Sequence, residues 1–207
     1  MRRLGILLSG RGSNFQAIAD SITAGRLDAE IVVVIANRAE APGLAIAKQR
    51  GLTAVCIPSR GLDRESYDRL LLEELAKRNV EVVCLAGYMR LLSPAFIRAY
   101  PMRILNIHPS LLPAFPGLDA QHQALEHGVK YSGCTVHFVD EGLDSGPIVQ
   151  QAVVPVEDAD TEESLSARIL KEEHRIYSEA LVVVLSGSYR VEGRRVIRED
   201  AGGDRLA

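Results

Sequence analysis

The chain has 207 residues, of which 47% are hydrophobic and 25% charged, the balance of a folded domain rather than a disordered chain. Acidic residues exceed basic residues by 27 to 24, so the net charge of −3 does not favour binding to nucleic acid or to an anionic membrane. At roughly 150 residues per domain, this length predicts a single domain over residues 1–200 and a frayed tail over 201–207.

Cysteine usage and the start of the chain predict a cytoplasmic protein. The three cysteines, Cys56, Cys84 and Cys134, lie far apart in apolar stretches and form no CxxC pair, which predicts buried thiols in a reducing compartment. The first apolar run stops at Ser9, too soon for a signal peptide, and no later run is long enough to span a membrane. We therefore expect a protein that is soluble and cytoplasmic.

Short runs rich in Val, Ile and Leu alternate with helical patterns along the chain. Such alternation is typical of repeated βαβ units around a mostly parallel, buried sheet. The predicted strands, in chain order, are 4–8, 31–36, 53–57, 81–86, 103–107, 132–139 and 147–154. We therefore expect an α/β fold around a mostly parallel, buried sheet.

Several segments carry helix signals. A helix over 63–78 would place four side chains on one buried face: Tyr67, Leu70, Leu71 and Leu75. Ser93 before Pro94 indicates a capped helix start, and Thr161 can cap a long helix that runs toward Leu185. The alternating segment 189–197 predicts a small hairpin.

The first predicted strand ends in a glycine-rich segment, Ser-Gly-Arg-Gly-Ser-Asn at 9–14, directly before a helical pattern. Backbone N–H groups and the helix dipole can hold a phosphate there. A dinucleotide fingerprint would need a third glycine where Phe15 stands and a ribose-binding acid after the second strand, where 37–38 are Asn-Arg. The segment therefore predicts a monophosphate site, with a structural turn capped by Ser13 as the alternative.

Asn106 and His108 are two residues apart on a predicted strand, so their side chains project to the same side. An amide and an imidazole together suit oxyanion stabilisation and proton transfer, which are the two needs of acyl transfer. The alternative is a purely structural histidine. The remaining histidines need no chemical role: His122 and His127 fall on a predicted helix, while His137 and His174 are expected to be packed.

The segment 139–147 carries three acids and two glycines between two predicted strands. A carboxylate that faced His108 would orient the imidazole and favour its protonated form. The alternative is an acidic surface turn, because Asp and Gly dominate turns generally. The sequence has no HExxH, CxxC or GxSxG motif that would indicate a metal site or a serine nucleophile.

Five motifs, at 9–14, 85–94, 106–113, 136–139 and 144–147, together resemble those of the folate-dependent phosphoribosylglycinamide formyltransferases of purine biosynthesis. The resemblance implies a Rossmann-like formyltransferase fold, with a mostly parallel central sheet flanked by helices and a long C-terminal helix. It also implies that 10-formyltetrahydrofolate, the cosubstrate, lies in a cleft beside glycinamide ribonucleotide.

The resemblance also implies roles for individual residues. The catalytic trio would be Asn106, His108 and Asp144. The ribonucleotide would be held by Gly12, Ser13, Asn14, Leu170, Lys171, Glu172 and Glu173. The formyl-folate would be held by Arg64, Met89, Arg90, Leu91, Leu92, Asn106, Asp140, Glu141, Gly142, Leu143 and Asp144. Residues 118–123 match the family less well.

The implied reaction is direct attack of the ribonucleotide amine on the formyl carbon, with no metal and no covalent enzyme intermediate. Its partners would be small molecules, with no nucleic acid and no membrane, and the oligomeric state stays open. Methionyl-tRNA formyltransferase and formyltetrahydrofolate hydrolase are alternatives that share the trio, but each normally carries an added domain for which we expect no room here. A non-catalytic phosphate-binding module is a further alternative, which would leave the trio unexplained.

Overall fold

The structure is a computed structural model that describes residues 1–199, so the tail expected over 201–207 lies outside the described residues. Its strands are β1 (Arg2–Leu8), β2 (Ala29–Ala36), β3 (Ala54–Cys56), β4 (Val82–Leu85), β5 (Ile104–His108), β6 (Tyr131–Phe138), β7 (Ile148–Pro155), β8 (Tyr189–Glu192) and β9 (Arg195–Arg198). Its helices are α1 (Ser13–Thr23), α2 (Pro42–Gln49), α3 (Arg64–Lys77), α4 (Pro94–Ala99), α5 (Ala120–Glu126) and α6 (Glu162–Ser186). The predicted strands are confirmed, with ends that differ from the prediction by one or two residues.

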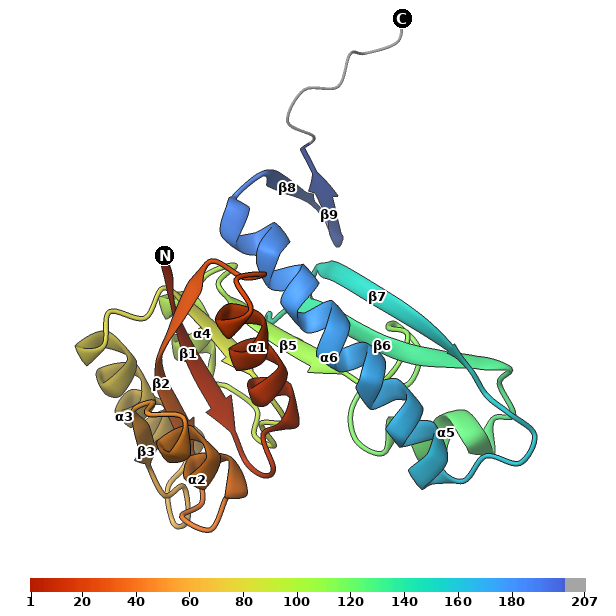
Figure 1. Cartoon of the computed structure of the whole chain (residues 1–207), viewed down its shortest axis with the longest axis horizontal. Helices are drawn as coiled ribbons and strands as arrows, with labels where there is room; N and C mark the ends of the chain where they lie inside the picture. The colour runs from red at the N-terminus through yellow and green to blue at the C-terminus, as the bar shows by residue number, and fades with distance from the viewer. Residues whose placement is uncertain (200–207) are drawn as a thin grey trace, which may run out of the picture.

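All these strands belong to one sheet, in the order β3-β2-β1-β4-β5-β6-β7-β9-β8 (Figure 1). The first five strands of that order run parallel, whereas β6 is antiparallel to β5 and β7 is antiparallel to β6. The mostly parallel sheet is therefore confirmed. Because the chain leaves β1 toward β2 on one side and later returns to β4 on the other, the carboxyl ends of β1 and β4 flank the crevice where ligands bind in such sheets.

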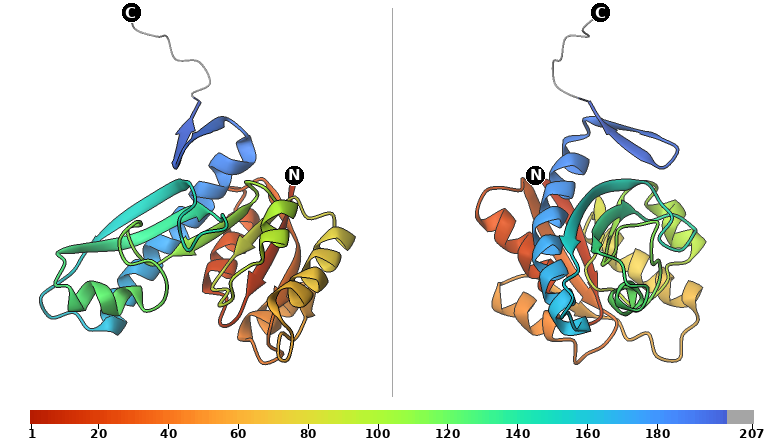
Figure 2. Two further views of the ribbon diagram at one scale, coloured as in Figure 1. Left: turned by 180° about the vertical axis from the view of Figure 1, so that it is seen from behind. Right: turned by 90° about the vertical axis from the view of Figure 1, so that its right-hand side faces the viewer.

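Helices cover both faces of the sheet (Figure 2), which produces two apolar cores. Residues of α1, α2 and α6 join the larger core, and residues of α3 and α4 join the smaller one. Within β1, Leu4 and Ile6 belong to the larger core and Leu7 belongs to the smaller one. Because both faces of the sheet are buried, the strands appear in the sequence as continuous apolar runs rather than as alternating apolar and polar residues.

At three single residues the structure differs from what the sequence suggested. Leu70 is 41% exposed, because its position on α3 lies outside the row of side chains that faces the sheet. The alternative in which Ser13 caps α1 is also wrong, because the N-cap is Gly12, whose φ of 72° is left-handed, and no side chain caps this helix. Cys56 is only partly buried, because β3 is an edge strand of the sheet.

Tyr177 joins α6 to the centre of the sheet. Its ring is fully buried, and its hydroxyl lies 3.0 Å from the carbonyl oxygens of both Leu85 on β4 and Leu105 on β5. A hydroxyl has one proton, so the two acceptors share one donor. Burial raises the pKa of Tyr177 well above its ordinary value, so the hydroxyl keeps that proton.

We expect Tyr177→Phe to lower the free energy of unfolding by about 1 to 2 kcal/mol, because two buried carbonyl oxygens lose their donor while the ring still packs. Urea unfolding followed by circular dichroism measures this loss. Tyr131→Phe is the matched control, since Tyr131 is 65% exposed and should change stability little. Equal stabilities of the two variants would contradict a role for the Tyr177 hydroxyl.

Candidate active site

The candidate active site lies near the carboxyl ends of β1, β4 and β5. The segments that follow β1 and β4 are tied together, because the backbone N–H of Ser9 donates to Gly87 O at 3.0 Å and the N–H of Met89 donates to Ser9 Oγ at 2.9 Å. Asn106 and His108 project from the end of β5, as their spacing predicts. The loop between β6 and β7 reaches the same place and brings Asp144 to His108.

His108 is held between a carboxylate and a carbonyl group. Its ring is 5% exposed, with Nδ1 at 3.4 Å from Asp144 Oδ2 and Nε2 at 2.8 Å from Phe115 O. A carbonyl oxygen only accepts, so Nε2 donates to Phe115. Both ring nitrogens therefore face oxygen atoms. The expected pairing of His108 with a carboxylate from this loop is present in the structure.

Asn106 contacts a second histidine, His137, which our sequence reasoning expected only to pack. The two residues are cross-strand partners on β5 and β6, and Asn106 Nδ2 lies 3.2 Å from His137 Nε2. Since His137 Nδ1 donates to Phe138 O at 2.9 Å, Nε2 can accept from Asn106. The alternation of residues along β6 could have indicated which face of the sheet His137 lies on. The strand register that places His137 opposite Asn106 cannot be predicted from a single sequence.

Burial holds His137 in its neutral form, because desolvation lowers its pKa below the ordinary value. The ring is 2% exposed, and Nε2 also lies 3.6 Å from Asp144 Oδ1. A neutral ring that accepts from Nδ2 fixes which way the Asn106 amide points. His137 thus orients Asn106, while Asp144 lies between the two histidines.

The loop that carries Asp144 is shaped by its own contacts rather than exposed as a simple acidic turn. Asp140 Oδ1 accepts from Gly142 N at 3.1 Å and from Ser145 Oγ at 2.7 Å, and Asp144 adopts a φ of 48°. A Cβ atom on Gly146 would lie 1.9 Å from Phe138 O, so only glycine fits there. The Asp144 side chain is 13% exposed, and its Oδ2 accepts from Gly117 N at 2.8 Å.

The glycine-rich segment lines a second part of the site, a pocket of about 320 Å³. The 11-residue helix α1 begins there without a side-chain cap, so its first backbone N–H groups are free of such a partner. A Cβ atom on Gly10 would meet nothing within 4 Å, because the space next to it is open. This is the arrangement in which helix termini bind phosphate groups.

Asn14 lines this pocket, and its side chain also contacts α6. Its Nδ2 donates to Glu173 Oε2 at 2.7 Å in a buried contact, and its Oδ1 has no partner among residues 1–199. Burial raises the pKa of Glu173 above its ordinary value. Of the residues expected around 170–173, Glu173 is hydrogen-bonded to the segment 9–14, whereas Leu170 is half-buried and Lys171 is exposed. Glu172 pairs with Arg175 at 2.6 Å.

Several of the residues expected to hold the formyl-folate are exposed apolar or basic side chains. Met89, Leu91 and Leu143 are 68%, 56% and 55% exposed, so these large apolar side chains are available to a ligand. Arg64 is exposed, and the Arg90 guanidinium lies 4.8 Å from the centroid of the Tyr67 ring. The other residues of this set differ in burial: Asp140 is half-buried, whereas Glu141 and Gly142 are exposed. Leu92 is only 7% exposed and packs in the core instead.

Within the described part of the chain, no group of three or more His, Cys, Asp and Glu side chains is arranged to hold a metal ion. Nor does any helix among residues 1–199 combine the length and the apolar character that crossing a membrane requires.

Comparisons with known proteins find similar sequences and structures. Residues 2–181 match the formyl transferase family. Phosphoribosylglycinamide formyltransferase of Escherichia coli (strain K12) is 44% identical over 205 residues, which cover 97% of this chain and 94% of that protein. The trifunctional purine biosynthetic protein adenosine-3 of Drosophila pseudoobscura pseudoobscura is 48% identical over 192 residues, or 91% of this chain, which spans only 14% of that relative.

A solved structure is also similar over nearly the whole length. Glycinamide ribonucleotide transformylase 1 from Symbiobacterium toebii superposes with a TM-score of 0.95 at 53% sequence identity, and the match covers 97% of this chain and 95% of that one. The Rossmann-like fold expected from the sequence motifs is therefore confirmed.

Glu173→Gln should make stability less sensitive to pH. Because burial raises the pKa of Glu173, the folded protein binds this proton more tightly than the unfolded chain does, and the wild type loses stability as pH rises through the folded-state value. Glutamine can still accept from Asn14 but carries no charge. Urea unfolding should show the variant gaining stability relative to the wild type between about pH 5 and about pH 8.

Glu126→Gln, at an exposed position, is the control and should show no such gain. If the free energies of unfolding of Glu173→Gln and the wild type differed by the same amount at both pH values, this would contradict the claim that the buried charge of Glu173 destabilises the protein.

Proposed function

Because this chain belongs to the formyl transferase family, we propose that it transfers the formyl group of 10-formyltetrahydrofolate to the primary amine of glycinamide ribonucleotide. The product would be formylglycinamide ribonucleotide, an intermediate of purine biosynthesis. The observation that carries the proposal is the grouping of the buried His108 with the partly buried Asn106 and Asp144. The names of the E. coli and Symbiobacterium relatives support this choice of substrates.

In the proposed reaction, the amine nitrogen of the ribonucleotide attacks the formyl carbon. The new C–N bond forms as the carbonyl π electrons move to oxygen, which gives a tetrahedral oxyanion. Asn106 and the protonated ring of His108 stabilise that oxyanion by hydrogen bonding. His108 Nε2 donates to Phe115 O at 2.8 Å, so the oxyanion would replace this carbonyl as the acceptor.

Collapse of the tetrahedral intermediate breaks the bond to the folate nitrogen. The attacking amine must lose a proton and the folate nitrogen must gain one, so the step needs a relay between them. Asp144 faces both His108 Nδ1, at 3.4 Å, and His137 Nε2, at 3.6 Å, and this carboxylate can hold a water that carries the proton. His137 acts as a positioning residue, because it orients Asn106 through the 3.2 Å contact.

The two ends of the ribonucleotide would occupy different parts of the site. Its phosphate would lie against the backbone of Gly12, Ser13 and Asn14 at the start of α1, where free N–H groups and the helix dipole favour an anion. Its glycinamide end would meet the buried carboxylate of Glu173. The formyl-folate would lie along the rim of residues 89–91 and the loop 140–144.

We expect His108→Ala to reduce kcat for formyl transfer by about 10²- to 10⁴-fold, the range for loss of a general acid or base, because the ring acts on the transition state. Ribonucleotide binding should be nearly unchanged, since the pocket around Gly10 does not include His108. Steady-state kinetics and calorimetric binding of the ribonucleotide measure the two effects.

His122→Ala is the matched control, because His122 is an exposed histidine whose nearest acid, Glu162, lies at 3.8 Å on the surface. Near-normal turnover in His108→Ala would remove this ring from the mechanism. The absence of formyl transfer in the wild type would contradict the proposed function as a whole.

We also expect Gly10→Val to raise the Kd of the ribonucleotide by about tenfold or more, because the new side chain would enter the open space beside the start of α1. Gly10 suits this test better than Gly12, where a φ of 72° and contacts at 3.2 to 3.3 Å would strain any side chain. Affinity for the formyl donor should change much less. Unchanged ribonucleotide affinity in a folded Gly10→Val variant would contradict the phosphate assignment.

A further inference from the structure

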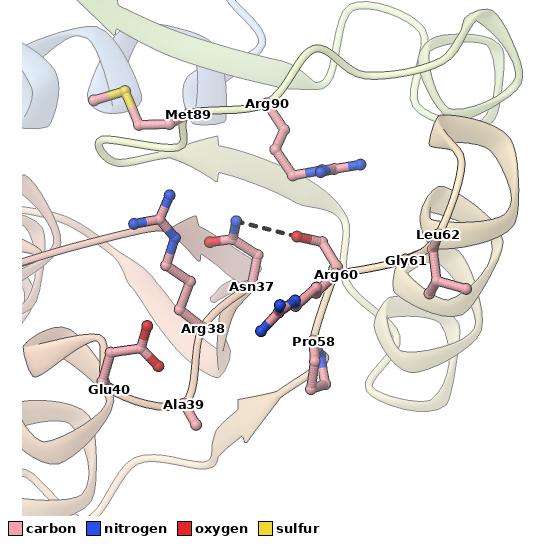
Figure 3. Close-up of a pocket in the computed structure, with 11 residues that line it drawn as sticks. Asn37, Arg38, Ala39, Glu40, Pro58, Arg60, Gly61, Leu62, Met89 and Arg90 are labelled. Carbon is pink, nitrogen blue, oxygen red and sulfur yellow. Dashed lines mark hydrogen bonds between the residues drawn. The ribbon is translucent and has the colours of Figure 1, made fainter.

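Residues 87–93, between β4 and α4, carry Met89 and Arg90, two of the side chains proposed to hold the formyl donor. Figure 3 shows both along one side of a cavity of about 660 Å³, whose lining also includes Arg38 and Arg60. The segment is irregular, and within residues 1–199 its N–H groups donate to no backbone carbonyl group. Side chains from other parts of the chain must therefore hold it in place.

Two side chains accept hydrogen bonds from the backbone of this segment. Near its start, Ser9 Oγ accepts from the N–H of Met89 at 2.9 Å. At its end, Asp68 Oδ2 accepts from the N–H of Ser93 at 2.5 Å. Ser93 also begins α4, because its Oγ accepts from the N–H of Phe96 at 3.2 Å. The rim proposed for the formyl donor thus lies between two hydrogen bonds, and Asp68 on α3 makes the second of them.

Asp68 is an acid buried behind the rim. It is 2% exposed, and it does not belong to the lining of the cavity in Figure 3. Burial raises the pKa of Asp68, while the hydrogen bonds from Ser93 and the positive charges of Arg90 and Arg64 act in the opposite direction. A buried carboxylate is costly unless such contacts compensate it. Asp68 therefore influences a ligand only through the groups that it holds.

Tyr67, the residue before Asp68 on α3, supports the middle of the rim. The guanidinium of Arg90 lies 4.8 Å from the centroid of its ring, which is fully buried in the smaller core. The hydroxyl of Tyr67 has no hydrogen-bond partner among the described residues. The face of the ring, rather than the hydroxyl, is therefore what Tyr67 offers to Arg90.

We propose that Asp68 and Tyr67 are positioning residues for the formyl donor, because together they hold the rim in the shape that the donor meets. The inference rests on the proposed function. Asp68 fixes the backbone at the end of the rim, and Tyr67 fixes the guanidinium of Arg90. Without these contacts the irregular segment would have to be ordered when the donor binds, which weakens binding. Neither residue acts on the reacting atoms, so its loss should change KM for the donor rather than kcat.

The first test is the steady-state kinetics of Asp68→Ala and Asp68→Asn. We expect Asp68→Ala to raise the KM for 10-formyltetrahydrofolate by about tenfold, the scale of one hydrogen bond to a charged group, and to change kcat less than about twofold. Asp68→Asn keeps an oxygen that can accept from Ser93, so its KM should return to within about threefold of the wild-type value. Calorimetry should show unchanged ribonucleotide affinity in both variants, because Asp68 does not line the pocket at the start of α1.

Leu75→Ala is the structural control. Leu75 is fully buried on the same helix and in the same core as Tyr67, so its truncation lowers the melting temperature, but it makes no contact that we assign to the rim. Its KM for the donor should equal that of the wild type at a temperature at which circular dichroism shows the variant to be folded. An unchanged KM in Asp68→Ala, no recovery in Asp68→Asn, or an equal rise in Leu75→Ala would overturn the inference.

Tyr67→Leu and Tyr67→Phe keep the inference testable if Asp68→Ala does not fold. Leucine removes the aromatic face next to Arg90 and should raise the KM for the donor by about threefold, the scale of one cation–π contact. Phenylalanine keeps this face and loses only the unpaired hydroxyl, so its KM should equal that of the wild type. Equal KM values in the two variants would overturn the role assigned to Tyr67.

Trypsin cleavage after Arg90, followed by mass spectrometry, measures the order of the rim without any ligand. This bond should be cut about fivefold faster or more in Asp68→Ala than in the wild type, because the segment opens more often, and Asp68→Asn should resemble the wild type. Equal cleavage rates in Asp68→Ala and the wild type would overturn the inference. Failure of the wild type to transfer the formyl group would instead contradict the proposed function, whatever the cleavage rates.

Discussion

The carboxylate of Asp144 is the contact on which the arrangement of the candidate active site depends. One oxygen accepts from the N–H of Gly117 and faces His108, while the other oxygen faces His137. A single side chain thus joins the loop after β5, the strands β5 and β6, and the loop before β7. Its left-handed backbone is tolerable because Asp140 and Ser145 fix the rest of that loop.

The reversal of strand direction at β6 makes this arrangement possible. In the antiparallel ladder Phe138 lies opposite Leu105, so the chain leaves β6 level with the early part of β5. The loop must then travel along β5 to reach His108, and the close approach at Gly146 and the bonds of Asp140 hold it there. The same ladder places His137 opposite Asn106. One change of direction therefore provides both the residue that orients the amide and the carboxylate that faces the imidazole.

Local patterns in the sequence predicted the elements and the spacing of the trio, because apolar periodicity, caps and strand alternation act over a few residues. They could not predict His137, whose role depends on which residue of β5 it pairs with, or the exposure of Leu70, which depends on how α3 is rotated against the sheet. The capping of α1 by Gly12 instead of Ser13 was also hidden, since it depends on backbone conformation. The cavity lined by Arg38, Arg60 and Arg90 could not be predicted either, because these residues are far apart in the sequence and come together only through the order of the strands.

Glu173 and Tyr177 lie four residues apart on α6, so both point from one face of the helix into the protein. The hydrogen bonds of the Tyr177 hydroxyl fix how α6 is rotated about its axis and how far it is shifted along β4 and β5. Because Glu173 lies one turn away on the same helix, these contacts also fix the position of its carboxylate. The chain can therefore vary in length before Thr161, where a loop absorbs the change, but not between these two residues. A single inserted residue there would turn the carboxylate by roughly 100° about the helix axis and separate it from Asn14.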